Sequence, residues 1–111
     1  MTDTGASTNP ATPSGSEIAQ SAEELDELRR QLAQTDPAVV VSNHCYGLFE
    51  LAAVYLSEQP PRLIEAQVAI DALAGVVDAL GERLGESAEP LAEGLAQLRL
   101  AWVQLRAVAD A

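Results

Sequence analysis

The chain has 111 residues, of which 48% are hydrophobic, and 17 acidic residues against six basic ones give it a net charge of −11. Because Lys and Arg dominate the affinity of proteins for phosphate backbones, this balance argues against direct binding to nucleic acid or to an anionic membrane. The length allows one small domain, and a single cysteine fits a reducing compartment without structural disulfides, so we expect a cytoplasmic protein.

Residues 1–17 are rich in Thr, Ser, Pro and Gly and contain almost nothing that could be buried. Such a segment cannot offset the entropy lost on ordering its backbone, which predicts a disordered tail. It lacks the basic start and apolar run of a secretory signal. No later stretch reaches the roughly 18 uninterrupted apolar residues that a transmembrane helix requires, so we expect no membrane span.

Residues 18–35 predict a short amphipathic helix. Ser21 and Glu24 have the spacing of a capping box, in which each side chain accepts a hydrogen bond from a free N–H at the helix start. Apolar residues then recur at helical spacing in a narrow stripe: Ile18, Leu25, Leu28 and Leu32. A helix of this length is marginal alone. It is expected to dock on the rest of the chain, to bind a partner, or to fray.

Residues 36–111 predict a helical bundle domain. Asp36 can cap a second helix and Pro37 suits its first turn, and this helix is expected over residues 38–56, before the breaking segment 57–61. Its apolar face is predicted to hold Val41, Cys45, Leu48, Ala52 and Tyr55. A neighbouring row holds Val40, His44, Leu48 and Leu51.

A third helix is predicted over residues 62–84, because apolar residues follow a heptad pattern without interruption. They are Leu63, Ala66, Ile70, Leu73, Val77, Leu80 and Leu84. Gly85 is placed to end this helix in a left-handed conformation. A mostly small-residue row lies beside the heptad row, and Gln67, Asp71, Asp78 and Glu82 are expected on the solvent side.

A fourth helix is predicted to begin near Ser87 or Glu89, and its apolar residues also step by three and four. They are Leu91, Leu95, Leu98, Trp102, Leu105 and Ala109, with Leu100, Val103 and Ala107 on another side. The connections are short, which predicts an all-α fold: a small antiparallel bundle of three main helices plus the short N-terminal helix. The surplus apolar faces predict a homodimer. Coverage of those faces by the helix of residues 18–35 is the alternative.

The sequence "NHCYG" places His44, Cys45 and Tyr46 side by side and suggests a ligand or metal site as an alternative. Neighbouring residues on a helix point about 100° apart, so His44 and Cys45 are poorly placed to share one metal ion or to act as a nucleophile and its base. A zinc site also needs three or four ligands, and the chain has no other His or Cys. We therefore expect Cys45 in the core, with neither metal nor cofactor.

The segment from Arg62 to Trp102 resembles the bacterial domain-of-unknown-function family eighteen forty-four, especially its actinobacterial branch. The resemblance rests on residues 69–75 ("AIDALAG"), the Leu84–Gly85 turn and residues 90–98 ("PLAEGLAQL"), and it covers about residues 36–106. It implies a helical protein linked by gene neighbourhood to translation, and it offers no catalytic residues. The pair His44–Cys45 departs from the family pattern.

We therefore expect a non-enzymatic, acidic helical protein that acts through protein–protein interaction and associates with itself, with a possible link to translation. The residues expected to make the packing and interaction seam are Ile70, Leu73, Val77, Leu80, Leu95, Leu98, Trp102 and Leu105. A basic protein partner for the acidic surface is a further expectation. The alternative is a small-molecule- or metal-binding protein or an enzyme with a site near His44, Cys45 and Tyr46.

Overall fold

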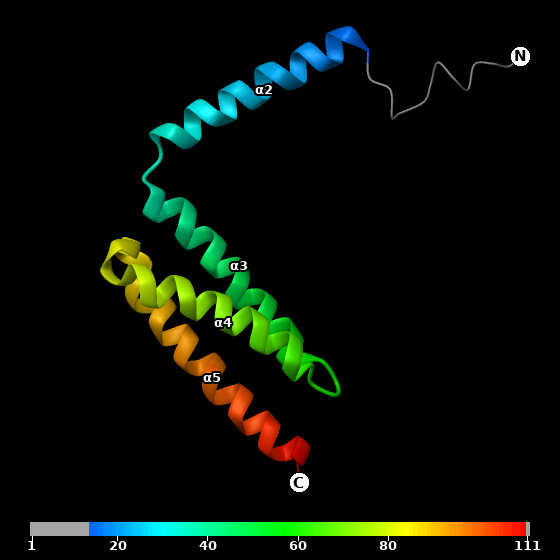
Figure 1. The fold of residues 1–111 in the computed structure, drawn as a ribbon, viewed down its shortest axis with the longest axis vertical. Helices are drawn as coiled ribbons and strands as arrows, with labels where there is room; N and C mark the ends of the chain where they lie inside the picture. The colour runs from blue at the N-terminus through cyan, green and yellow to red at the C-terminus, as the bar shows by residue number, and fades with distance from the viewer. Residues whose placement is uncertain (1–13, 111) are drawn as a thin grey trace, which may run out of the picture. The chain divides into compact units, whose positions relative to one another are not determined.

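The computed structural model describes residues 14–110, and it confirms the all-α prediction, because every regular element in this range is helical (Figure 1). The elements are α2 (Gly15–Gln34), α3 (Pro37–Ser57), α4 (Leu63–Leu80), the 3₁₀ helix η1 (Gly81–Ser87) and α5 (Ala88–Asp110). Contacts divide the chain between Thr35 and Asp36 into two units.

Helix α2 begins earlier than the sequence pattern suggested. The capping box is formed by Ser14 and Glu17: the Ser14 side-chain oxygen accepts the Glu17 N–H at 3.2 Å, and the Glu17 carboxylate accepts the Ser14 N–H at 2.7 Å. The prediction that Ser21 and Glu24 cap this helix is therefore wrong, because the same Ser-x-x-Glu spacing occurs seven residues upstream and the helix already runs through Ser21. The predicted tail of residues 1–17 lies mostly outside the described residues, and its last three residues are helical.

Helices α3, α4 and α5 form the bundle, with consecutive helices antiparallel and each of the three in contact with the other two (Figure 1). The predicted cap of α3 is confirmed, since an Asp36 carboxylate oxygen accepts the Ala38 N–H at 2.9 Å and Pro37 occupies the first turn. Helix α3 matches its predicted range to within one residue at each end, and α5 begins at Ala88, between the two predicted starts.

The predicted third helix, residues 62–84, is too long. Helix α4 ends at Leu80, and the chain turns through η1 with Gly81 at φ 51° and Gly85 at φ 66°. Both torsions are in the region that L side chains rarely adopt, so the two glycines permit the turn. Leu84 still fills the next apolar position and is buried, although it does so from η1. The heptad pattern therefore continues past the point where the helix ends.

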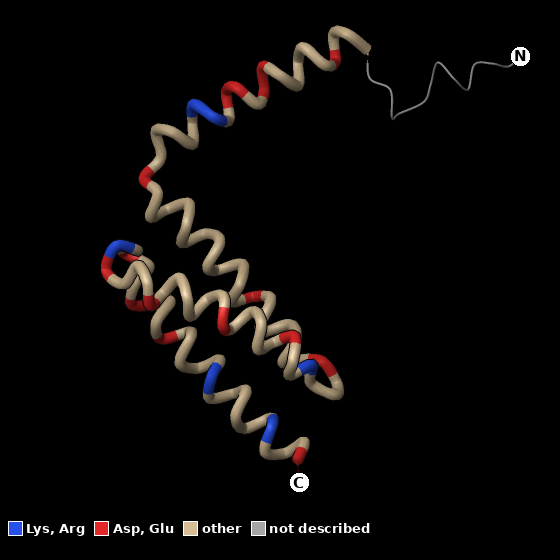
Figure 2. Tube along the Cα trace, in the orientation of Figure 1, with Lys and Arg blue, Asp and Glu red and all other residues tan. Residues whose placement is uncertain are grey.

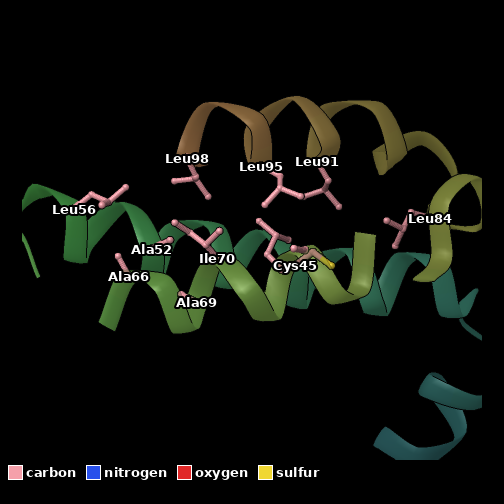
Figure 3. Close-up of a cluster of buried hydrophobic side chains, with 12 residues drawn as sticks. Cys45, Ala52, Leu56, Ala66, Ala69, Ile70, Leu84, Leu91, Leu95 and Leu98 are labelled. Atoms are coloured by element: carbon pink, nitrogen blue, oxygen red, sulfur yellow. The ribbon is translucent and has the colours of Figure 1, made fainter. Parts of the chain in front are cut away.

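Small residues bring α3 and α4 together, and leucines of α5 cover the pair (Figure 3). Ala52 and Ala66 are fully buried, which allows close approach of the two helices. The buried hydrophobic residues are Cys45, Ala52, Leu56, Ala66, Ala69, Ile70, Leu73, Ala74, Leu84, Leu91, Leu95 and Leu98. Of the eight residues expected to form the seam, Ile70, Leu73, Leu95 and Leu98 belong to this core, whereas Val77, Leu80, Trp102 and Leu105 are partly buried and pack against it.

Two specific contacts fix α5 against its neighbours. The indole N–H of Trp102 donates a hydrogen bond to the Leu63 carbonyl oxygen at 2.9 Å, tying α5 to the start of α4. Gly94 lies against the ring of Phe49 on α3, so closely that an added Cβ would stand 2.8 Å from a ring carbon. Gly47 and Gly75, in contrast, would place a Cβ in open space. Only Gly94 of these three glycines is therefore required by packing within the bundle.

Candidate interaction surface

The structure places His44, Cys45 and Tyr46 in three different surroundings. Cys45 is 1% exposed and belongs to the core, whereas His44 is exposed. Tyr46 is also exposed, and its hydroxyl donates a hydrogen bond to the Ser87 hydroxyl at 3.3 Å. Burial raises the pKa of the Cys45 thiol, which disfavours the thiolate that a nucleophile or metal ligand needs. The arrangement therefore offers no shared reaction centre.

The ionisable groups are spread along the helices (Figure 2). Within residues 14–110 no three His, Cys, Asp or Glu side chains gather closely enough to hold a metal ion. At the start of α4, the Arg62 guanidinium lies 2.8 Å from the Glu65 carboxylate. The pKa of Glu65 is lowered by the hydrogen bond from its own backbone N–H and by Arg62, and the pKa of Arg62 is raised by its bond to Glu65. This exposed pair favours the helix start rather than acid–base chemistry.

Two open hollows lie along α5. The smaller, of about 280 Å³, lies between α4 and α5 and is lined by Gln67, Ile70, Arg99, Trp102 and Val103. The larger, of about 570 Å³, lies between the segment after α3 and the last turns of α5. Neither is lined by His44, Cys45 or Tyr46. Both hollows are open to solvent and have mainly apolar linings.

Each helix of the bundle carries a second apolar row on the side away from the core. The outer row of α3 consists of Val40, His44, Gly47, Leu51 and Val54, and all but the half-buried Val40 are exposed. The outer row of α4 consists of Ile64, Val68, Ala72, Gly75 and Ala79, and that of α5 of Ala96, Leu100, Val103 and Ala107, all of them exposed. Ile64 and Val68 are 82% and 68% exposed, values unusual for large aliphatic side chains of a small bundle.

Helix α2 has an apolar row and no buried residue. This α2 row consists of Ile18, Ser21, Leu25, Leu28 and Leu32, spaced as the a and d positions of heptads. Its four large side chains are 49–57% exposed. Since most of the stability of a helix in a protein comes from packing of its apolar face, such a row stabilises α2 mainly when something covers it.

The sequence predicted the apolar rows on α2 and α5 and part of the rows on α3 and α4, but it did not predict Ile64 and Val68 in the outer row of α4. The polar residues Gln67, Asp71 and Asp78 marked that side of the helix as wet. Ile64 and Val68 stand one turn apart on the same outward side, and this spacing is the signal that could have identified the row.

One helix within residues 14–110, α3, is long and apolar enough to cross a membrane by length and composition. The core helix of a soluble protein meets the same criteria, and α3 contributes Cys45, Ala52 and Leu56 to the core of the bundle.

The geometry thus defines a class, a small antiparallel three-helix bundle with apolar outer rows. Comparison of the chain with protein-family models, with curated proteins and with solved structures gave no match.

Proposed function

We propose that this protein acts by protein–protein association and that it associates with itself. The observation that supports the proposal is the set of outer rows on α3, α4 and α5. Nine large hydrophobic residues of the bundle are at least 40% exposed: Val39, Tyr46, Leu51, Val54, Ile64, Val68, Leu100, Val103 and Val108. Exposed apolar rows on a small protein are typical of interaction sites.

A second feature supports association. Gly47 and Gly75 each lie inside a helix and in an outer row, where glycine lowers helix stability by about 1 kcal/mol relative to alanine. No atom of the bundle lies within 4 Å of where their Cβ atoms would be. Packing within the bundle therefore gives no reason for either glycine, whereas close approach of a helix from another molecule does.

The acidic surface bears on the choice of partner. With a net charge of −11, two copies repel one another at long range, so self-association must rest on apolar contacts and should strengthen with added salt. A basic protein partner would show the opposite salt dependence. The link to translation and the cytoplasmic location remain predictions.

Sedimentation equilibrium on the purified full-length chain, at several concentrations and at low and high salt, tests the proposal. We expect twice the chain mass of 11.7 kDa, with tighter association at high salt. A single species of 11.7 kDa up to the highest usable concentration would contradict self-association. Dissociation by salt would contradict the apolar contact.

A further inference from the structure

The α2 row and the outer row of α3 match each other in antiparallel register. The residues pair as Ile18 with Val54, Ser21 with Leu51, Leu25 with Gly47, Leu28 with His44, and Leu32 with Val40. The two numbers of each pair add to the same value, so all five layers form at once. Each a position of one helix meets a d position of the other, as knobs-into-holes packing of antiparallel helices requires.

The side chains in these layers complement one another. Leu25 faces Gly47, an exposed helical glycine that has no packing role within the bundle. The position without a side chain on α3 therefore lies opposite a leucine of α2. Ser21, the only small polar member of the α2 row, faces Leu51. Six large aliphatic residues that are 42–57% exposed become covered: Ile18, Leu25, Leu28, Leu32, Leu51 and Val54.

The connection between the two helices is short and contains no glycine. Only Thr35 and Asp36 separate α2 from α3; Thr35 is extended, with ψ 140°, and Asp36 has ψ 124°. Pro37 favours this conformation at Asp36. The chain reversals within the bundle instead use residues 58–62 or the positive-φ glycines Gly81 and Gly85. Return of α2 onto its own α3 would have to be made by Thr35 and Asp36 alone, and the cross-linking experiment distinguishes it from contact with a second copy.

We propose that the outer row of α3 binds the α2 row of a second copy of this chain, and that α2 of the first copy binds α3 of the second in the same way. The reciprocal exchange makes the two contacts equivalent, so the assembly closes as a dimer. The proposal rests on the proposed self-association and specifies its interface.

The buried area suits such a dimer. A Leu, Ile or Val side chain offers roughly 100 Å² of apolar surface, and the six side chains named above begin about half exposed. Taken over two contacts, they bury roughly 600 Å² of apolar surface. The small row residues, His44 and the flanking side-chain stems add to this, toward the ~1,000 Å² that a specific interface needs. One contact alone would supply only half of this area.

Two carboxylates of like charge lie at the edge of the proposed interface and weaken it. Glu24 and Glu50 directly precede Leu25 and Leu51, so both occupy g positions and lie on the same flank of an antiparallel pair. The two carboxylates repel one another there, once in each contact. Glu23 lies on the opposite side of α2 and provides a matched control position.

Cysteine pairs on the full-length chain test the register and the copy together. In the double variant Ser21→Cys/Leu51→Cys, mild oxidation should give a reducible covalent dimer at low micromolar concentration. The control Glu23→Cys/Leu51→Cys, with the new thiol on the far side of α2, should give no covalent dimer. The native Cys45 is 1% exposed and does not compete. Mass spectrometry of the linked peptides identifies the bond.

Each outcome decides the proposal. A disulfide that joins the thiols introduced at Ser21 of one chain and Leu51 of another supports it. The same disulfide within one chain shows that α2 folds on its own α3 and overturns it. Equal cross-linking of variant and control overturns the register, even if sedimentation shows a dimer and the proposed function stands.

A change of charge provides an independent check on the register. Glu24→Arg replaces the repulsion from Glu50 with an attraction and should tighten the dimer roughly three- to tenfold, whereas Glu23→Arg should not. Sedimentation at low salt measures both variants. Equal effects of the two would also overturn the register.

Discussion

Replacing Gly94 with alanine should destabilise the bundle, whereas the same change at Gly75 should stabilise it. Both glycines lie inside helices, so each substitution gains about 1 kcal/mol of helix propensity. At Gly94 the new Cβ would lie 2.8 and 3.1 Å from two ring carbons of Phe49, and the ring must move by several tenths of an ångström while it is packed against the core. Such overpacking costs about 1–3 kcal/mol. At Gly75 the new methyl group meets no other residue of the bundle.

The difference between the two variants isolates the contact, because the propensity gain cancels. Gly94→Ala should therefore be less stable than Gly75→Ala by about 1–3 kcal/mol, which in a domain of this size is a gap of roughly 4–24 °C in Tm. Urea unfolding at one fixed protein concentration, followed by Trp102 fluorescence, measures it. In a Phe49→Leu background the gap should shrink by more than half. Equal stabilisation by both alanines would refute the close approach of α5 to α3.

Three further changes probe the core, the thiol and the α4–α5 tie. Leu73 is fully buried, so Leu73→Ala should lower the free energy of unfolding by about 2–5 kcal/mol and Leu73→Asp should prevent folding. Val68 is exposed on the same helix, so Val68→Asp should leave the urea midpoint of the bundle nearly unchanged. Because burial raises the pKa of Cys45, the folded state keeps the thiol proton up to a higher pH than the unfolded state does, so the free energy of unfolding should fall as pH rises above ~8.5. A Cys45→Ala variant whose unfolding free energy has the same slope against pH would exclude this cause. Trp102→Phe should lose about 0.5–1.5 kcal/mol with the bond to the Leu63 carbonyl, and calorimetry that finds no loss would show that bond to be dispensable.

Much of the bundle could be predicted from the sequence because its helices are long and periodic. The spacing around Ile70 and Leu73 identified the core row of α4, and Asp36–Pro37 identified the start of α3. The ends of the helices were harder to predict, because an apolar heptad pattern can continue beyond the residue at which the helix ends. Leu84 continues the heptad row, yet Gly81 had already turned the chain.

The candidate surface could be predicted only in part. Heptad spacing shows which residues share a side of a helix, but burial shows which of two apolar rows faces the core. On α3 both rows are apolar, and the sequence assigned Leu48 to each of them; the structure places Leu48 against the core and Leu51 outside it. His44, the only histidine, was a candidate ligand in the sequence. Its exposed position in the outer row of α3 depends on the rotation of that helix about its own axis.

The placement of the aromatic residues makes the two units separately observable. All four aromatic side chains lie in α3 or α5, and α2 has none. Fluorescence of Trp102 therefore follows the bundle alone, while far-ultraviolet circular dichroism follows every helix. If α2 melts by itself, the two signals separate and a single unfolding temperature has no meaning. If α2 binds another copy, the separate loss of ellipticity from α2 melting should disappear as the protein concentration rises. Thermal melts at a series of protein concentrations would measure this change.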